Sequence, residues 1–272
     1  MRRRTRVTEA YIAKLGQTLT PRDHELIASL DRVRVATASQ LRRLHVAEGT
    51  TAAQVRITQR RLRALTDLRV VTLLDRQVGG FGGGSRDGVY ALDTAGQHLA
   101  SACGPAGGAR LRRPWTPGSS FLLHQLAVAE LYVRLRELER QGVLDELLAF
   151  DAEPAAWRRF TGPGGALSWL KPDAFSRVGR ADWEFASFIE VDRATASVPT
   201  VMRKLAVYRR YFQTGREQER FGLFPRVVLL APTEARKEAL VAALAAQPAD
   251  AWELFRVALY DDASSVLTGE AA

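Results

Sequence analysis

The sequence contains one cysteine, Cys103, only four histidines, and no run of about 18 consecutive apolar residues. A single cysteine cannot form an intramolecular disulfide, and the scattered histidines do not have the spacing of a zinc site. The missing apolar run argues against a membrane-spanning helix. The arginines near the start, in MRRRTRVTEAY, are not followed by the apolar region of a secretory signal. We therefore expect a cytoplasmic protein that is not bound to a membrane.

Positive charge is present in excess, and it is concentrated at one end of the 272-residue chain. Residues 1–70 carry 15 Lys and Arg against 6 Asp and Glu, whereas residues 119–272 carry 19 against 21. A strongly basic part joined to a near-neutral part is typical of a polyanion-binding module, and nucleic acid is the commonest polyanion. The alternative is a basic surface that is merely solvated. The length and the 46% hydrophobic content are sufficient for two domains.

The basic part predicts three helices followed by a β-hairpin. Thr20 is a good N-cap before Pro21, and it predicts a first helix to about residue 32. A second helix is expected within 36–46, capped by Thr37 or Ser39, and a third within 51–68. Strands are expected at 70–78 and 87–93, joined by GGFGGGSR. This order predicts a winged helix-turn-helix over residues 21–100, between a basic arm at 1–20 and a linker at 101–118.

The third predicted helix has a basic face opposite its apolar face, which contains Val55, Leu62, Leu65 and Leu68. Residues 61–75, RLRALTDLRVVTLLD, resemble the passage from recognition helix to wing in many winged regulators. The resemblance implies that the helix enters the major groove of double-stranded DNA and reads bases with arginine and glutamine. Some winged domains bind only protein, which is the alternative. The expected DNA-binding residues are Arg56, Gln59, Arg60 and Arg63, with Arg42, Arg43, Arg86 and Arg193.

The C-terminal part, residues 119–272, alternates helix and strand. A long helix is expected at 121–142, and the order that follows predicts strand, strand, strand, helix, strand, helix, strand. Pro172-Asp173 lies on one predicted strand, and Glu190-Val191-Asp192 ends the next. This arrangement resembles the PD-(D/E)xK nuclease superfamily. The fold class expected for the whole chain is α+β in two domains, a winged helix-turn-helix and a restriction-endonuclease-like domain.

The acidic residues predict a metal site. Alternation along a strand places Glu190 and Asp192 on one face, and the neighbouring strand can bring Asp173 beside them. Three carboxylates suit Mg²⁺ or Mn²⁺, and in such a site the metal would activate water against a phosphodiester. The superfamily normally has lysine where this chain has Asp192. The candidates that compensate are Lys204 and Tyr208, four residues apart on the next helix, so the predicted catalytic residues are Asp173, Glu190, Asp192, Lys204 and Tyr208.

One further resemblance unites both halves. A winged module, a linker, KPDAF and then FIEVDRATASVPTVMRKLAVYRRYF are similar to the replication-relaxation family of actinobacterial plasmids and integrative elements. The resemblance implies a role in replication or mobilisation of plasmid DNA, with replication or mobilisation proteins as partners. Winged domains often dimerise, so a homodimer is one form of assembly. Two hypotheses remain. The protein is a metal-dependent DNA nickase or endonuclease, or it is a DNA-binding accessory factor or transcriptional regulator without cleavage.

Overall fold

The computed structural model describes residues 6–74, 87–103, 118–247 and 253–270. The chain divides into two compact units, Met1–Val133 and Arg134–Ala272, and the division falls within the long helix α6 (Ser119–Arg140). Each unit has its own sheet and its own buried core, so each is described by itself. No helix among these residues has both the length and the apolar character needed to cross a membrane.

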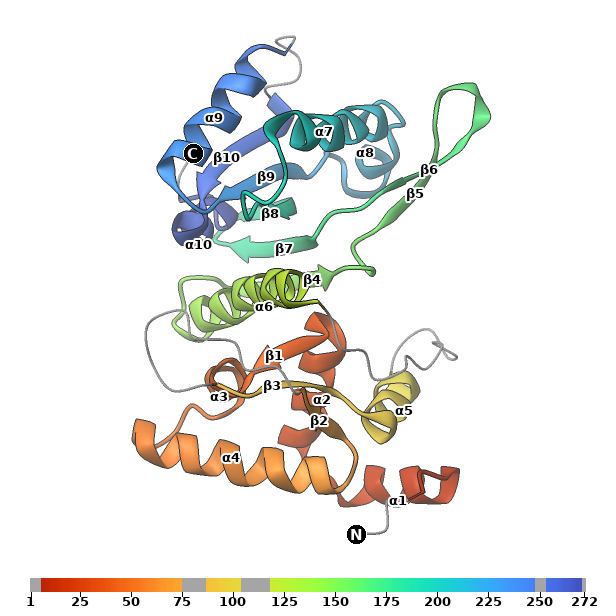
Figure 1. Ribbon diagram of the computed structural model, residues 1–272, viewed down its shortest axis with the longest axis vertical. Coiled ribbons are helices and arrows are strands. Elements are labelled where there is room, and N and C mark those ends of the chain that lie inside the picture. Colours follow the sequence, from red (N-terminus) through yellow and green to blue (C-terminus); the bar gives the residue numbers. More distant parts are fainter. Residues whose placement is uncertain (1–5, 75–86, 104–117, 248–252, 271–272) are drawn as a thin grey trace. The chain divides into compact units, whose positions relative to one another are not determined.

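The first unit consists of helices around a small antiparallel sheet. Three strands pair in the order β1-β3-β2. The three helices expected from the sequence are present as α2, α3 and α4, and β2 and β3 follow them (Figure 1). The elements are α1 (Glu9–Thr18), α2 (Pro21–Val33), β1 (Val35–Thr37), α3 (Ala38–His45), α4 (Thr51–Asp67), β2 (Val71–Leu73), β3 (Val89–Leu92) and α5 (Thr94–Cys103).

Three features of this unit differ from the expectation. Residues 9–18, assigned to a basic arm, form helix α1, because Thr8 caps it and Leu15 is buried. Strand β1 was not predicted, since three residues are too short for an alternating pattern. Val55 was placed on the apolar face of α4, but its side chain is 37% exposed. The glycine-rich segment between the two hairpin strands and most of the expected linker lie outside the described residues.

A buried carboxylate ties α2 to α4. Asp23 closes a capping box with Thr20 at the start of α2, and the same carboxylate accepts hydrogen bonds from the Arg61 guanidinium of α4. Burial acts to raise the pKa of Asp23, but the hydrogen bonds from Arg61 and Thr20 outweigh it and lower that pKa. Arg61 therefore belongs to the packing of the unit, unlike its neighbours on α4.

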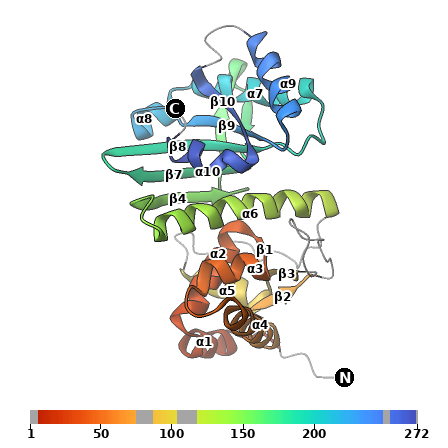
Figure 2. The same cartoon turned by 90° about the vertical axis from the view of Figure 1, so that its left-hand side faces the viewer.

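The second unit is built on a mixed five-stranded sheet. The strand order is β10-β9-β8-β7-β4, with β8, β9 and β10 parallel and with β7 antiparallel to both of its neighbours (Figure 2). Strands β5 and β6 form a separate two-stranded ribbon. The strands are β4 (Glu146–Ala152), β5 (Arg158–Thr161), β6 (Leu167–Leu170), β7 (Ala174–Arg180), β8 (Trp183–Val191), β9 (Arg226–Ala231) and β10 (Phe255–Leu259).

Helices cover both faces of this sheet. Helix α7 (Val198–Phe212) buries Leu205, Tyr208 and Tyr211 against Phe188, Val227 and Leu229, and α9 (Glu234–Ala245) joins the same core. The short helix α10 (Ala263–Leu267) also contacts β8, β9 and β10. Aromatic rings of the core lie 5 to 7 Å apart in tilted and edge-on pairs; Phe188 and Tyr208, for example, are 5.8 Å apart.

The order of elements in the second unit follows the prediction, with two additional strands and two additional α-helices. The segment expected as one strand, ALSWLKPDAFSRV, is divided between β6 and β7, because Pro172 interrupts it and β6 pairs with the unpredicted strand β5. Helix α8 (Arg216–Phe221) follows α7, and α10 follows the last strand. The expected hairpin of β7 and β8 is present.

Candidate functional site

The pairing of β7 with β8 places Asp173 opposite Glu190. The ladder begins at Ala174 paired with Ile189, and the backbone amide of Asp173 donates to the carbonyl of Ile189. Side chains alternate along a strand, so Asp173 shares the face of Phe175, and Glu190 shares that of Phe188, which lies under α7. Asp173 and Glu190, the acidic pair, are 8% and 7% exposed. Two residues 17 positions apart in the sequence are therefore brought together at the end of the central strand.

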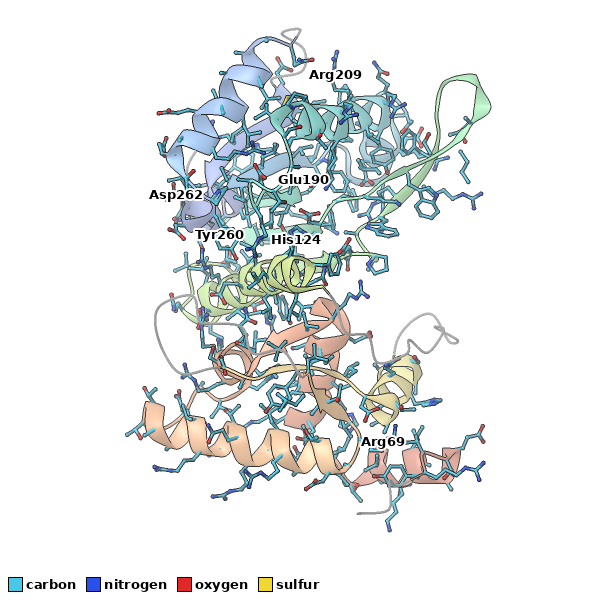
Figure 3. The ribbon with its side chains drawn as sticks, viewed as in Figure 1. Arg69, His124, Glu190, Arg209, Tyr260 and Asp262 are labelled. Carbon is cyan, nitrogen blue, oxygen red and sulfur yellow. The ribbon has the colours of Figure 1, made fainter. Side chains whose placement is uncertain are left out.

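Helix α7 supplies a cation and a hydroxyl to the acidic pair, of which Glu190 is labelled in Figure 3. The Lys204 ammonium lies 3.2 Å from Asp173 Oδ1 and also donates to Glu190 Oε2. The Tyr208 hydroxyl donates to Glu190 Oε1 at 2.5 Å. The backbone amide of Val191 donates to Asp173 Oδ2 at 2.8 Å. Because Lys204 and Tyr208 are one helical turn apart, one face of α7 holds both carboxylates.

Burial decides the protonation of this group. Desolvation and the neighbouring Asp173 raise the pKa of Glu190 to about 8, although Lys204 and Tyr208 act in the opposite direction. Burial acts to lower the pKa of Lys204, but the charges of Glu190 and Asp173 overcome it and raise that pKa. Burial and Glu190 together raise the pKa of the Tyr208 hydroxyl. Lys204 is consequently charged and Tyr208 neutral at physiological pH, and Glu190 exchanges its proton within reach of that pH.

Asp192 is directed away from the acidic pair. It follows the end of β8, where its Oδ2 accepts a hydrogen bond from Arg236 Nε of α9 at 2.5 Å and its Oδ1 accepts one from the Ala194 amide at 2.8 Å. Arg236 also donates to the carbonyl of Ala196. Over the described parts of the chain, no three His, Cys, Asp or Glu side chains are grouped as a metal site. The structure thus brings four of the five predicted catalytic residues together and places Asp192 with Arg236.

The acidic pair alone has the chemistry of a magnesium site. Asp173 Oδ1 and Glu190 Oε2 both contact one atom, the Lys204 nitrogen, so these two oxygens already share a single cation. Mg²⁺ in proteins is commonly held by one or two carboxylates and completes its octahedral shell with water and substrate phosphate. The donor set therefore fits such an ion. The Lys204 side chain is 40% exposed, so it reaches both the pair and solvent.

The other predicted interface lies on α4 in the first unit. Arg56, Gln59, Arg60 and Arg63 are exposed and share one face by their spacing, and this face is called the α4 outer face. Within the described ranges, these four side chains make no hydrogen bond or ion pair. The opposite side of the helix buries Thr58, Leu62 and Leu65. The outer face therefore presents three guanidinium groups and an amide that the packing of the unit does not use.

Two of the remaining predicted DNA-binding residues, Arg42 and Arg43, have partners within the protein. Arg43 forms an ion pair of 2.6 Å with Glu130 in α6, and Arg42 donates to Gln54 of α4 at 2.7 Å. These contacts give both residues a role in packing. Arg193 is half-buried and follows Asp192, and Arg86 lies outside the described residues.

Sequence reasoning missed the two arginines that fix the site's surroundings. Arg236 holds Asp192, and Arg158 donates from β5 to the buried Glu217 of α8 at 3.0 Å. Each partner is more than 40 residues away in the sequence. No local pattern connects such residues, so only the fold reveals them. A buried acidic residue needs a cation, which is the one general signal that could have prompted the search.

Comparison with known proteins agrees with the resemblance noted in the sequence. The family model described as replication-relaxation matches residues 27–227, which include α4, the acidic pair, Lys204 and Tyr208. No curated protein matches the chain, and no solved structure matches it. Because the family match covers well over half of the 272 residues, the chain belongs to the replication-relaxation family.

Proposed function

We propose that the protein binds double-stranded DNA through the α4 outer face and acts in the replication or mobilisation of plasmid or integrative-element DNA. The observation that carries this proposal is that the three arginines of this face have no acidic partner among the described residues. Arginine is the commonest reader of guanine in the major groove, and it also holds phosphates. The order of elements from α2 to β3 supports this proposal, because a winged helix-turn-helix has its helices and hairpin in a similar order and inserts its third helix into the groove.

The charge of the chain supports the same assignment. The excess of positive charge lies within residues 1–70, which include α4. Membership in the replication-relaxation family suggests DNA as the substrate of the whole protein. Protein binding by this face is less favourable, because three exposed arginines without an acidic partner among the described residues suit a polyanion better than a protein surface.

The test is duplex binding by the variant Arg56→Ala/Arg60→Ala/Arg63→Ala. We expect about a hundredfold or greater loss of affinity, and we expect the slope of affinity against salt to fall by about one for each arginine that contacts phosphate. Fluorescence anisotropy with random and candidate origin duplexes measures both. The matched control is Arg256→Ala, an exposed arginine of β10. Equal affinities of the triple variant and the wild type would contradict the proposal.

A second function is favoured by the convergence of Asp173, Glu190 and Lys204, namely metal-dependent hydrolysis of a phosphodiester in DNA. Asp173 and Glu190 would hold Mg²⁺ or Mn²⁺ through the oxygens that now face Lys204. When bound, the ion would activate a water molecule and neutralise charge on the phosphate. Strand, strand and helix supply these residues in the order expected of a PD-(D/E)xK fold, with lysine moved from the strand to α7.

Each residue of the site would have its own role in this second function. Asp173 is oriented by the Val191 amide, and Glu190 is oriented by Tyr208, which is a positioning residue. Lys204 is partly exposed and charged, so it could donate to a phosphate oxygen when Asp173 and Glu190 hold an ion. Glu190 must lose its proton to bind the ion, so metal affinity should rise as the pH approaches about 8.

Cleavage is tested on supercoiled plasmid with Mg²⁺ or Mn²⁺. We expect relaxed or linear product from the wild type, and a loss of about a hundredfold or more in Asp173→Asn and in Glu190→Gln. Asp192→Asn is the discriminating control, because Asp192 contacts Arg236 and should leave cleavage within about threefold of the wild type. Absence of cleavage by the wild type, with duplex binding intact, would instead identify an accessory DNA-binding factor.

A further inference from the structure

The β5–β6 ribbon has two unlike faces. Arg158 pairs with Leu170, Arg159 with Trp169, Phe160 with Ser168 and Thr161 with Leu167. Because side chains alternate, Phe160 and Leu170 lie on one face, and both are 1% exposed and part of the core. The opposite face, called the outer face of the ribbon, carries Arg159, Thr161, Leu167 and Trp169. Figure 1 shows the ribbon extending beyond the five-stranded sheet of the second unit.

The outer face combines aromatic rings with cations. Trp169 is 47% exposed and Leu167 is 54% exposed, and Arg159 lies directly across from Trp169. The alternation continues to Lys171 and Trp157 at the base of the ribbon. There the Lys171 ammonium lies 4.7 Å from the centre of the Trp157 ring, and the two tryptophan rings are 6.4 Å apart and edge-on. Large exposed aromatic side chains need an explanation when the core does not use them.

The ribbon is held firmly in place from its inner side. Arg158 is 13% exposed and forms an ion pair with Glu217, which is 2% exposed, and the Tyr211 hydroxyl donates to the same carboxylate at 2.6 Å. The Arg158 guanidinium also lies 5.0 Å from the centre of the Phe175 ring. The outer face is therefore presented by a fixed element and is not the result of a loosely attached hairpin.

A polar pocket adjoins the far end of the outer face. Its volume is about 400 Å³, and no acidic residue lines it. Arg216 belongs to the pocket, and its guanidinium donates to the backbone carbonyl of Arg159 at 2.8 Å, which links the pocket to the ribbon. The lining residues are Thr161, Gly162, Arg210, Gln213, Thr214 and Arg216. Two guanidinium groups with hydroxyl and amide donors form a recess suited to a phosphate group.

We propose that the outer face of the ribbon and this pocket form a binding surface for single-stranded DNA, separate from the α4 outer face. Trp169 stacks on an unpaired base, Arg159 and Lys171 lie along the backbone, and Arg210 and Arg216 hold a phosphate in the pocket. Sequence-tolerant binding of single strands uses this combination of aromatic platforms and a cationic track. The surface belongs to the unit that carries the acidic pair, so it would hold a strand opened from the duplex.

The chemistry favours a single strand over other occupants. Bases in a duplex are covered by their neighbours in the stack, so Trp169 could not stack on them without unpairing. A protein partner would be expected to fill an apolar groove, whereas the pocket beside the ribbon is polar and cationic. An anionic lipid surface would also attract tryptophan and basic residues, but it would not need a recess lined by two guanidinium groups.

The test uses the full chain with Arg56→Ala/Arg60→Ala/Arg63→Ala, so that the α4 outer face no longer carries its arginines. This protein is titrated with a fluorescent oligothymidine and, in parallel experiments, with a duplex hairpin and with anionic phosphatidylserine vesicles. We expect the single strand to bind and to quench tryptophan fluorescence, and Trp169→Ala to weaken binding by about tenfold. Arg159→Ala/Arg216→Ala should weaken it by a similar factor and reduce the salt slope. Trp169→Phe, which keeps a ring, should recover much of the loss.

The matched control is Trp183→Ala, because Trp183 is 72% exposed on β8 but is not part of the ribbon. Equal effects of Trp169→Ala and Trp183→Ala would overturn the proposal. So would tighter binding to the vesicles or to the hairpin than to the single strand. Thermal unfolding of each variant verifies that the fold is intact. The arginines of the α4 outer face are replaced in every protein of this test. Failure of the proposed duplex binding by α4 and failure of the proposed single-strand binding by the ribbon therefore give separate results.

Discussion

Helices α4 and α7 both carry basic residues, yet these residues have opposite surroundings. On α4 the outer arginines form no ion pair within the described ranges, whereas on α7 Lys204 contacts two carboxylates. Both helices bury an apolar side against their own sheet or helices. The difference shows that a basic residue on an amphipathic helix is informative about a ligand only when its protein partners are known. A basic side chain without a protein partner is available to an external anion, whereas one with such partners organises a site.

The largest expected effect on stability follows from removing the Lys204 ammonium, which contacts both carboxylates. Lys204→Met leaves Asp173 and Glu190 buried side by side without a positive charge. We expect the free energy of unfolding to fall by about 2 kcal/mol, a moderate value because the lysine is 40% exposed and partly screened. The loss should be greater at pH 9 than at pH 6, since Glu190 accepts a proton at the lower pH. Urea denaturation at the two pH values measures the loss of unfolding free energy. An equal loss at both pH values would contradict the dependence of the Lys204 contact on the protonation of Glu190.

A second effect depends on the protonation of Glu190. The pKa of Glu190 is about 8 in the folded protein, against 4.5 ordinarily, so the folded state holds a proton that the unfolded state has lost. This contribution to stability is complete below about pH 4.5 and is lost as the pH rises to about 8. Glu190→Gln cannot titrate, so its unfolding free energy should decline less than that of the wild type over that interval. Urea denaturation in EDTA from pH 5 to 8.5 measures the slope.

The smallest expected effect on stability concerns the three arginines of the α4 outer face. Arg56→Ala/Arg60→Ala/Arg63→Ala should change the free energy of unfolding by no more than about 0.5 kcal/mol, because exposed residues without partners contribute little to stability. Thermal unfolding measured beside Asp23→Ala gives the contrast, since Asp23 is buried and bonded to Arg61. A large destabilisation by the triple variant would mean that the α4 outer face has a packing role and would weaken its assignment to DNA.

The sequence was most informative where local rules act. The N-cap at Thr20, the proline that follows it and the period of α4 depend on neighbouring residues only, and the structure has these features. The pairing of β7 with β8 was also within reach, because the two strands are adjacent in the chain. That pairing together with α7 is sufficient to bring Asp173, Glu190, Lys204 and Tyr208 into contact.

What could not be predicted depends on distant partners and on the ends of strands. Alternation placed Asp192 beside Glu190, but β8 ends at Val191 and the alternation ends with it, so Arg236 from α9 determines where Asp192 points. The ribbon was missed because Arg158–Thr161 is a four-residue strand without alternating polarity in sequence. Arg43 was expected at DNA but pairs with Glu130, 87 positions away. Each case needs a tertiary contact that no window of sequence contains.

The residues that hold helix α4 in place lie on one side of it. Arg61 forms an ion pair with Asp23, and Leu62 and Leu65 are buried in the core, so this side alone determines the orientation of the helix. The four positions on the other side are consequently free to vary without disturbing the fold. If the α4 outer face binds DNA as proposed, a set of proteins on this scaffold could diverge in the operator each recognises by exchanging those side chains. The same freedom would then allow a designer to redirect the protein to a chosen origin while leaving the C-terminal unit unchanged.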